Sequence, residues 1–544
     1  MPRITIDGKI IEVPAGRTIL QALDDTGLLM NGVDVPHYCW HPKLSIDGSC
    51  RLCQVEVEGM PKLQIACNIP VQDGMAVRTD TERVRQAREG VMELLLVNHP
   101  LDCPICDQAG ECKLQDYAFE YGVDSSRSQE PRRALEKRKD LGPTILLDQE
   151  RCILCRRCVR FCDEVPATGE IRVMGRGDRS VIDIQDGYPL ENDYSMNVAD
   201  ICPVGALTTK DFRFKIRVWF LEDVPGVCTG CSNGCNLHLG VANNKVQRYV
   251  PRRNDSVNET WICDAGRMSY QRIGAGDRLS EAQVRSGGSQ GTGRLETVGI
   301  VAALEQAAQK LRRVVDSRGA DSVVALASPH AGNEDLFTLR RFCDALGVGA
   351  SGVAVVRGDS DALLVKSEKA ANAEGARRLG FGDPSDVLDR IRGGQAAAAV
   401  VLGHDLLDPS FLGATDVLAG LDTLIVLDTH QSSLDRVADV LIPVRHPAEK
   451  NATLTNSAGR VQRVQPAVEP AWEAWTDGEV IAKLGALLDL DGFDGSWEPR
   501  EVSKALSQEL PAFAGVHLGG VGDQGLSLQG AAEGSDPETG GASA

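Results

Sequence analysis

The sequence reads CILCRRCVRFC at residues 152–162 and reaches a Cys-Pro pair at Cys202. Cysteines at C-x2-C-x2-C-x3-C spacing are typical of [4Fe–4S] binding, and where two clusters are present the fourth Cys of the run ligates the other one. A second run would have to precede Cys202, but residues 185–201 contain no cysteine. The pattern therefore predicts one cluster, and Cys162 is interpreted as a buried thiol. The predicted ligands are Cys152, Cys155, Cys158 and Cys202.

A first group of four cysteines precedes this run, with the spacing C-x10-C-x2-C-x13-C. Four thiolates can hold a [2Fe–2S] cluster, and two cysteines at x2 spacing let one loop bind one iron. Gly48 and Gly59 flank the central pair and allow the backbone to approach the sulfurs. A structural zinc site has the same kind of ligands and stays open. The predicted ligands are Cys39, Cys50, Cys53 and Cys67.

A second group has the spacing H-x3-C-x2-C-x5-C. A neutral imidazole in place of one thiolate makes a cluster less negative and should raise its reduction potential. Pro100 is expected to end the preceding helix and turn the chain at this point. A surface histidine beside a three-cysteine zinc site is the alternative. The predicted [4Fe–4S] ligands are His99, Cys103, Cys106 and Cys112.

A fourth group follows at C-x2-C-x3-C-x27-C, with Gly230 and Gly234 in its loop. Zinc is again an alternative, but a fourth cluster motif in one chain favours a purpose shared with the others. The predicted [4Fe–4S] ligands are Cys228, Cys231, Cys235 and Cys263. Of 17 cysteines only Cys162 and Cys343 then have no role, and Cys343 lies in a helical pattern typical of a core residue. Of nine histidines only His99 has ligand-like spacing.

Composition excludes several other classes of protein. With 42% apolar residues the protein is globular, and a net charge of −19 argues against a nucleic-acid-binding surface. No apolar run approaches the roughly 18 residues of a membrane helix, and the start, MPRITIDGKIIEV, reads as a strand rather than a signal peptide. We therefore expect a soluble, cytosolic chain without a direct membrane span. Because thiols stay reduced there, dense cysteines indicate metal rather than disulfides.

Local patterns predict an α+β front end followed by an α/β domain. A hairpin around Asp7-Gly8 and a helix opened by Thr18 indicate a β-grasp domain. Another helix is expected at residues 82–97, an exposed connector at 125–142 and a flexible linker at 284–294. Apolar strands alternate with helical segments after residue 297, which suggests a parallel sheet. The expected strands are 322–328, 396–403 and 423–428.

These patterns divide the chain into six parts. We expect a β-grasp domain, three further cluster domains, an α/β domain and a disordered tail, at residues 1–80, 81–122, 140–216, 221–277, 297–515 and 520–544.

The order and spacing of the groups resemble the large iron–sulfur subunit of respiratory complex I, the NADH-quinone oxidoreductase. The segments HPLDCPICDQAGECKLQD (99–116), NVADICPVGALTTKDFRFK (197–215) and CTGCSNGC (228–235) carry the resemblance. Residues from the fourth group onward resemble molybdopterin oxidoreductases, and HPAEKNATLTNSAGRVQR (446–463) is similar to their signature. The matching positions are Glu449, Thr453, Asn456, Gly459, Arg460 and Gln462, while Ala452 stands where Gly is usual. In the complex I subunit this domain is a shortened relic, so no molybdenum is expected.

The resemblance implies a proton-translocating NADH:quinone oxidoreductase in which this subunit transfers electrons and has no catalytic residue. Electrons would enter at the [2Fe–2S] site, pass through the Cys202 site to the His99 site and continue toward quinone, with the fourth site off this path. The implied partners are an NADH/FMN-binding subunit, a small [2Fe–2S] thioredoxin-like subunit and a ferredoxin-like two-cluster subunit. No NADH or FMN site is found in this chain. The implied location is a peripheral arm on the cytoplasmic side of the bacterial inner membrane.

Two other electron-transfer enzymes share the order of the groups. A catalytic subunit of an NAD-linked formate dehydrogenase would carry molybdenum, which the short second half argues against. The diaphorase subunit of a soluble NAD-reducing hydrogenase usually ends near residue 240, whereas this chain has 544 residues.

Overall fold

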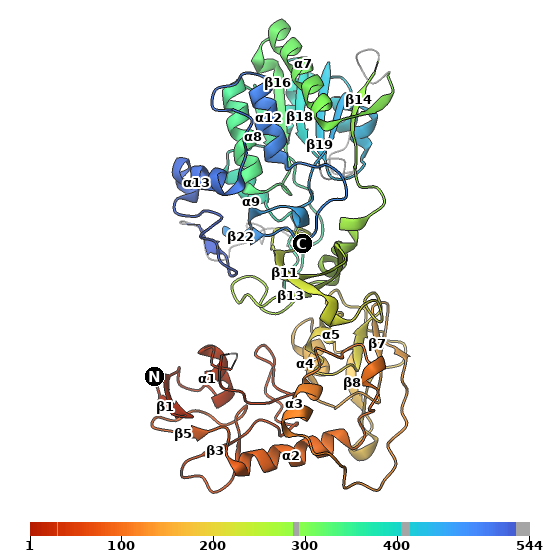
Figure 1. Ribbon diagram of the computed structural model, residues 1–544, viewed down its shortest axis with the longest axis vertical. Helices are drawn as coiled ribbons and strands as arrows, with labels where there is room; N and C mark the ends of the chain where they lie inside the picture. The colour runs from red at the N-terminus through yellow and green to blue at the C-terminus, as the bar shows by residue number, and fades with distance from the viewer. Residues whose placement is uncertain (30, 287–292, 404–413, 529–544) are drawn as a thin grey trace, which may run out of the picture. The chain divides into compact units, whose positions relative to one another are not determined.

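The computed structural model describes residues 1–29, 31–286, 293–403 and 414–528. They belong to two compact units, Met1–Leu221 and Glu222–Ala544, each of which is described by itself (Figure 1). Within these ranges, no helix has both the length and the apolar character needed to cross a membrane.

The first unit begins with the predicted hairpin. Strand β1 (Arg3–Ile6) pairs antiparallel with β2 (Lys9–Glu12), and the φ angles of Asp7 and Gly8 are 47° and 82°. Positive φ at both central residues is the geometry of a type I′ turn, whose twist matches that of the two strands. The hairpin prediction is confirmed.

The hairpin belongs to a five-stranded sheet in the order β2-β1-β5-β3-β4, packed against helix α1 (Ile19–Asp25). The side chain of Thr18 accepts a hydrogen bond from Gln21 N at 3.3 Å, and the Gln21 side chain accepts one from Thr18 N at 3.0 Å. This capping box fixes the start of α1 where the sequence predicts it. The remaining strands are β3 (Gln54–Val57), β4 (Gln64–Ile65) and β5 (Ala76–Arg78).

The rest of the first unit consists of short elements joined by irregular segments. Helix α2 (Glu82–Leu96) confirms the predicted helix, and the chain between residues 123 and 138 is mainly exposed and contains no helix or strand. A three-stranded sheet, a two-stranded sheet and helix α4 (Arg157–Glu164) follow. The other elements are α3 (Lys113–Tyr121), β6 (Lys139–Asp140), β7 (Ile145–Leu147), β8 (Ile171–Met174), β9 (Val181–Ile184), α5 (Asn197–Ile201) and β10 (Leu207–Thr209).

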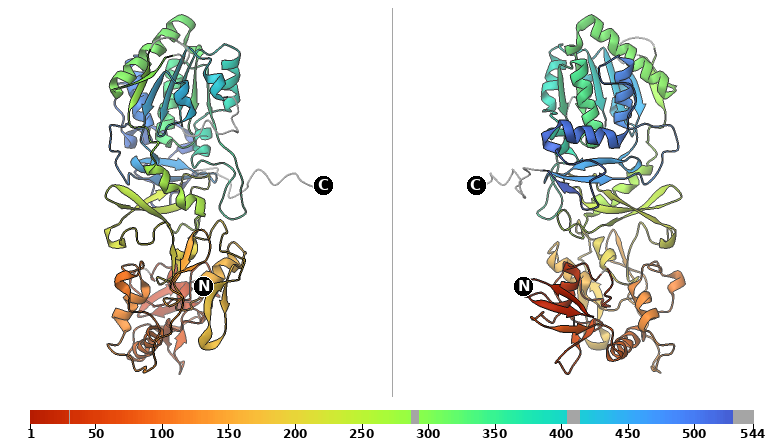
Figure 2. Two further views of the ribbon diagram at one scale, coloured as in Figure 1. Left: turned by 90° about the vertical axis from the view of Figure 1, so that its right-hand side faces the viewer. Right: turned by 60° about the vertical axis from the view of Figure 1, so that its left-hand side comes forward.

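The second unit is built on a seven-stranded sheet in the order β15-β14-β20-β19-β18-β16-β17. Its five strands from β20 to β17 are parallel, as the sequence predicts. Along β16 (Val323–Ala327), side chains alternate between two cores, with Ala325 in one and Val324 and Leu326 in the other. Helices therefore cover both faces of the sheet (Figure 2). The other strands are β14 (Ala282–Arg285), β15 (Leu295–Val298), β17 (Ala350–Val353), β18 (Ala398–Leu402), β19 (Thr423–Asp428) and β20 (Val440–Pro443).

Two three-stranded sheets, β11-β12-β13 and β21-β22-β23, complete the second unit. Their strands are β11 (Glu222–Val227), β12 (Asn236–Ala242), β13 (Lys245–Pro251), β21 (Ala452–Thr455), β22 (Arg460–Val464) and β23 (Leu526–Ser527). The helices of the unit are α6 (Asp264–Met268), α7 (Ile300–Arg318), α8 (Asn333–Leu346), α9 (Ala373–Arg378), α10 (Pro384–Arg392), α11 (Ala414–Leu418), α12 (Asp477–Leu487) and α13 (Pro499–Glu509).

The structure differs from the sequence prediction at three segments. The expected exposed connector 125–142 ends in strand β6, which pairs with β7, and Leu141 is fully buried. The expected linker 284–294 starts inside β14, because Val284 pairs with Val440 of β20, and its residues 287–292 lie outside the described residues. In the expected disordered tail, residues 529–544 lie outside the described residues, but β23 pairs with β22 and Leu528 is buried. The last two differences come from pairing with strands distant in sequence, which a local Gly-rich composition does not reveal.

Candidate iron–sulfur sites

Two members of the first predicted group, Cys53 and Cys67, belong to the core of the five-stranded sheet. Three of its four thiols, Cys39, Cys53 and Cys67, are at most 1% exposed. Hydrogen bonds with Cys50 and Cys67 lower the pKa of the Cys39 thiol, and the same bonds raise the pKa of both partners. The Cys53 thiol is also hydrogen-bonded to Cys67. The structure thus brings all four predicted ligands together.

The second group is arranged around the loop that follows α2. The Nδ1 atom of His99 is buried and, within the described residues, has no hydrogen-bond partner. Burial lowers the pKa of His99 to about 4, so the imidazole is neutral, which is the form that binds a metal. An unpaired buried nitrogen is costly unless a ligand satisfies it. This observation fits His99 as a ligand.

Two cysteines of the second group are buried, and the sulfur of one of them packs against a glycine. Cys106 and Cys112 are each 8% exposed, whereas Cys103 is exposed. A Cβ atom built on Gly205 would lie 2.3 Å from Cys106 Sγ, so a glycine is needed there. Gly205 lies within the segment 197–215 that carries the resemblance, but nothing in that segment indicates its contact with Cys106.

The third group lines a small cavity of about 20 Å³ in the first unit. All four predicted ligands contribute to its wall, together with apolar side chains such as Leu147, Ile182 and Val204. Burial raises the pKa of the Cys152 and Cys202 thiols to about 12. Such thiols would stay protonated at neutral pH unless a metal bound them, because coordination stabilises the thiolate. Four convergent cysteines in an apolar pocket therefore fit a cluster.

Cys162 is fully buried on α4 and is absent from the wall of this cavity. Its carbonyl oxygen accepts hydrogen bonds from Thr168 N at 2.8 Å and Gly169 N at 3.0 Å. The predicted burial of this thiol is confirmed. The same holds for Cys343, which packs in the core of the second unit on α8.

The fourth group lies in the second unit, where Cys228 and Cys235 stand at the ends of β11 and β12. A Cβ atom on Gly266 would lie 3.1 Å from the sulfurs of both Cys228 and Cys263, so these two sulfurs converge over the start of α6. Backbone N–H groups approach them: Gly230 N lies 3.5 Å from Cys228 Sγ, and Gly266 N lies 3.3 Å from Cys263 Sγ. N–H···S bonds of this kind stabilise thiolates and raise the potential of a cluster that they hold.

Two residues of the molybdopterin-like signature (446–463) form hydrogen bonds with the loop of this fourth group. Gln462 Nε2 donates to Gly234 O at 2.9 Å, and Asn456 Nδ2 donates to Asn233 O at 3.0 Å. Asn233 in turn donates to Cys235 Sγ at 3.1 Å. Two signature residues thus hold the turn between Cys231 and Cys235 in place.

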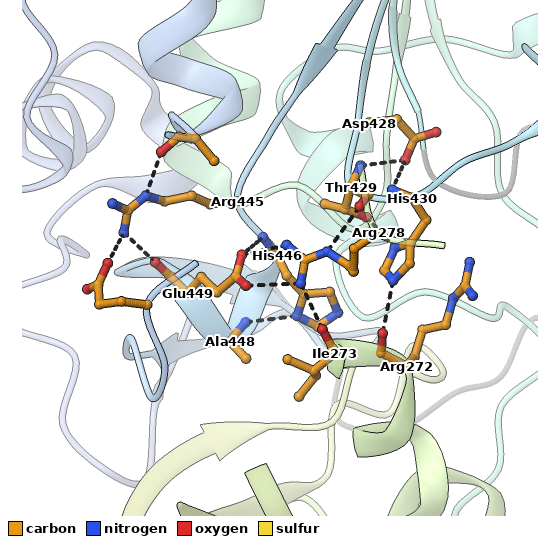
Figure 3. A network of polar contacts seen from close by, with 12 residues as sticks. Arg272, Ile273, Arg278, Asp428, Thr429, His430, Arg445, His446, Ala448 and Glu449 are labelled. Atoms are coloured by element: carbon orange, nitrogen blue, oxygen red, sulfur yellow. Dashed lines mark hydrogen bonds and ion pairs between the residues drawn. The ribbon is translucent and has the colours of Figure 1, made fainter. Parts of the chain in front are cut away.

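Another signature residue, Glu449, belongs to the polar network in Figure 3. Arg278 donates to both carboxylate oxygens of Glu449, at 2.9 and 2.8 Å, and both side chains are at most about 5% exposed. Glu449 also accepts from His446 N at 2.8 Å, and the Nδ1 atom of His446 accepts from Ala448 N at 3.1 Å. The network therefore fixes the segment that precedes β21.

A pocket of about 350 Å³ lies beside this network in the second unit. His330, His430 and His446 contribute to its wall, at the carboxyl ends of parallel strands, where open α/β sheets bind ligands. The His430 ring is fixed on both sides, with Nδ1 2.8 Å from Thr429 Oγ1 and Nε2 2.9 Å from Arg272 O (Figure 3). Residue spacing carries no signal for these three histidines.

Among the described residues, no three His, Cys, Asp or Glu side chains surround a point where one metal ion could bind. A cluster spreads its ligands over two or four irons, so its cysteines need not meet at a single point. The fit of each group therefore depends on the enclosing cavity, the unpaired imidazole and the glycine contacts described above.

Comparison with known families divides the chain in the same order. The matches are to a 2Fe-2S iron-sulfur cluster binding domain (2–82), the NADH-ubiquinone oxidoreductase-G iron-sulfur binding region (88–127), the ferredoxin-like domain of NADH-quinone oxidoreductase subunit 3 (142–208), the molybdopterin oxidoreductase Fe4S4 domain (221–274) and molybdopterin oxidoreductase (367–487).

A curated relative, an NADH-quinone oxidoreductase subunit from Rickettsia bellii, is 39% identical over 347 residues, which are 64% of this chain and 49% of the relative. The chain is similar to this complex I subunit. The NADH dehydrogenase [ubiquinone] iron-sulfur protein 1 of Solanum tuberosum mitochondria is 38% identical over 344 residues, or 63% of this chain and 45% of that protein. The chain thus spans about half the length of the complex I relatives that it matches.

A different enzyme matches a longer part of the chain. The NADPH-Fe(3+) oxidoreductase subunit alpha of Geobacter sulfurreducens is 38% identical over 410 residues, which are 75% of this chain and 45% of that protein. Among solved structures, an NAD+-reducing [NiFe]-hydrogenase matches 40% of this chain and 91% of its own at 30% identity, with a TM-score of only 0.35. Iron–sulfur domains, followed by a molybdopterin oxidoreductase domain, are common to the family matches and to the complex I resemblance.

Proposed function

We propose that this chain is an electron-transfer subunit of NADH-quinone oxidoreductase. In this proposal the first group holds one [2Fe–2S] cluster and the other three groups hold one [4Fe–4S] cluster each, on the sixteen predicted ligands. Iron–sulfur clusters supply one-electron transfer at potentials that the protein sets. The chain itself would contribute the spacing of the sites, their burial and their hydrogen bonds.

The observation that carries the proposal is the contact between neighbouring cysteine groups in the first unit. Cys202 belongs to the third group, and the residue after it, Pro203, has its carbonyl oxygen 3.9 Å from Cys112 Sγ of the second group. Gly205, in the same segment, faces Cys106. The segment from Cys202 to Gly205 therefore serves the third group and touches the second.

A similar contact joins the first and third groups. Arg160 of α4, the helix that carries Cys158, donates a hydrogen bond to the carbonyl oxygen of Cys39. The order of contacts is thus first group, third group, second group. This is the order in which the complex I resemblance passes electrons toward quinone, and a conductor of single electrons requires such closely packed sites.

The partners and the location follow from the same proposal. An NADH/FMN-binding subunit, a small [2Fe–2S] subunit and a ferredoxin-like two-cluster subunit would complete a peripheral arm on the cytoplasmic side of the membrane. No molybdenum is proposed for the second unit.

A second candidate is a subunit of an NADPH-dependent iron(III) reductase. The longer match to the Geobacter relative favours it, because it extends over 75% of the chain. The two candidates differ in electron donor and acceptor, and both retain the four cluster sites.

The deciding experiment is affinity purification of the tagged chain from its native host, with quinone reduction and iron(III) reduction measured on the isolated complex. We expect NADH-dependent quinone reduction and co-purification of membrane subunits. NADPH-dependent iron(III) reduction by a complex without membrane subunits would establish the second candidate instead. A chain that contains zinc and no iron would contradict both.

A further inference from the structure

The interface between the first and third groups is formed by one face of α4. Arg160 donates to the carbonyl oxygens of Cys39 and Ser45, and Ser45 donates in turn to the Glu164 carboxylate through both its amide and its hydroxyl. These contacts hold α4 against the loop that carries Cys39.

Arg157 is the side chain that spans this interface. Its Nη2 atom donates to Trp40 O at 2.6 Å, and its Nη1 atom donates to Ile201 O at 3.1 Å. Trp40 directly follows Cys39, and Ile201 directly precedes Cys202. One planar guanidinium therefore bridges the backbone beside a ligand of the first group and the backbone beside a ligand of the third.

Among the residues that the structure describes, no carboxylate pairs with this guanidinium. Within the described residues, the hydrogen-bond acceptors of Arg157 are two carbonyl oxygens, and its Nε atom is buried and unpaired. Its side chain contributes to the wall of the third cavity together with Cys155 and Cys202, and its acceptor Trp40 O belongs to the residue after Cys39 of the first group. A confined arginine remains charged and requires nearby negative charge to offset its desolvation.

We propose that Arg157 is a positioning residue that acts as a counter-cation shared by the first and third iron–sulfur sites and raises the reduction potentials of both. The inference rests on the proposed cluster sites. Four thiolates make each oxidised cluster anionic, and reduction adds one further negative charge, so a fixed cation favours the reduced form. Because one cation serves both sites, removing it should lower both potentials together.

The test is a potentiometric titration of the iron-loaded full chain, with the paramagnetic resonance of each reduced cluster followed separately. In Arg157→Gln we expect the reduction equilibrium constants of the first and third sites each to fall about tenfold, equivalent to about 59 mV for a one-electron couple. The fourth site should be unchanged. Arg157→Lys should restore part of both shifts, since it keeps the charge but cannot bridge both carbonyl oxygens.

Ser45→Ala is the matched control, because it removes a hydroxyl hydrogen bond from the same interface without changing the charge near the sulfurs. It should leave both potentials in place. Equal shifts in Ser45→Ala and Arg157→Gln would overturn the inference, as would a shift at only one site or at neither.

Should Arg157→Gln lose its clusters, Arg157→Met is titrated in its place. If both neutral variants lose the first and third clusters while Arg157→Lys retains them, the positive charge is required at both sites and the inference stands. Loss of the clusters in the lysine variant as well would overturn it. A wild-type chain that binds no iron would instead refute the proposed cluster sites, and the two failures are therefore distinguishable.

Discussion

The amide nitrogen of Gln462 donates a 2.9 Å hydrogen bond to the carbonyl oxygen of Gly234, across 228 positions of sequence. Its amide oxygen accepts from the Asn236 side chain, so both polar atoms of the Gln462 amide are hydrogen-bonded. The Gln462 residue is only 2% exposed. Gln462→Ala would remove both hydrogen bonds and leave Gly234 O and Asn236 Nδ2 with only the long 3.5 Å bond between them. Weakened pairing of buried polar groups costs about 1–3 kcal/mol. We expect lower thermal stability and partial loss of the fourth cluster, measured by calorimetry and iron content. Arg463→Ala, a neighbour on β22 whose side chain contacts Asn451, should retain all the iron.

Metal content tests the number of sites. One [2Fe–2S] and three [4Fe–4S] clusters predict about 14 iron atoms per anaerobically purified chain, and we expect no molybdenum. Cys162→Ala should keep about 14 because this thiol is absent from the wall of the third cavity. Cys158→Ala, by contrast, should lose about four. An iron count near about 18 in the wild type, or equimolar molybdenum, would contradict the prediction.

His99 offers a test of ligand type at the second site. His99→Cys replaces a neutral ligand with a thiolate, which makes the cluster more negative and should lower its potential and slow turnover. A redox titration measures the shift, and an iron content of about 14 confirms that the cluster is retained. An unchanged potential would show that His99 is not a ligand.

Gly205 tests the packing around the same site. Because a Cβ there would lie 2.3 Å from Cys106 Sγ, Gly205→Ala should displace that sulfur and lower the iron content by about four atoms. Gly90→Ala is the control, since Gly90 lies within α2 and a Cβ there meets nothing within 4 Å. It should retain the iron and slightly stabilise the helix. Full iron occupancy in Gly205→Ala would place the second cluster elsewhere.

The buried carboxyl of Glu334 should make the stability of the second unit depend on pH. Burial raises the pKa of this carboxyl to about 7, although Thr453 donates to both of its oxygens. The folded state therefore favours the protonated form, so its contribution is complete below the ordinary pKa of 4.5 and is lost as the pH rises through about 7. Between these pH values the wild type should lose more free energy of unfolding than Glu334→Gln, by at most about 3 kcal/mol. The free energy of unfolding of both proteins is measured by chemical denaturation at each pH. If it changed with pH in the same way for the wild type and for Glu334→Gln, the prediction would be contradicted.

Local sequence signals predict those parts of the structure that depend on neighbouring residues. The turn at Asp7-Gly8 and the helix after Thr18 depend on backbone conformation and capping within a few residues, and both are confirmed. The apolar strands of the second unit are likewise visible as runs. The structure places the four cysteines of the third group around one cavity, although Cys202 lies outside the short run that spacing reveals. The ligand sets of all four groups stay predictions.

Contacts between distant segments could not be predicted in this way. Nothing in the sequence around Gly205 indicates that Cys106 packs against it. The last two residues of β14, Val284 and Arg285, fall in the predicted linker 284–294, because their partner strand β20 lies far along the sequence. Arg157 stands between two cysteines of one motif, yet its two acceptors come from separate segments. Such roles depend on how the domains pack, which spacing within one motif does not encode.

The exposure of Cys103 has a practical consequence. Every other cysteine in the four groups is at least partly shielded from solvent, so molecular oxygen can reach a cluster most directly through this one. Oxidation of cysteine and of its bound sulfide follows accessibility. On exposure of the purified protein to air, the signal of the His99-containing site should decay first, and the order in which signals disappear would map the depth of each site below the surface.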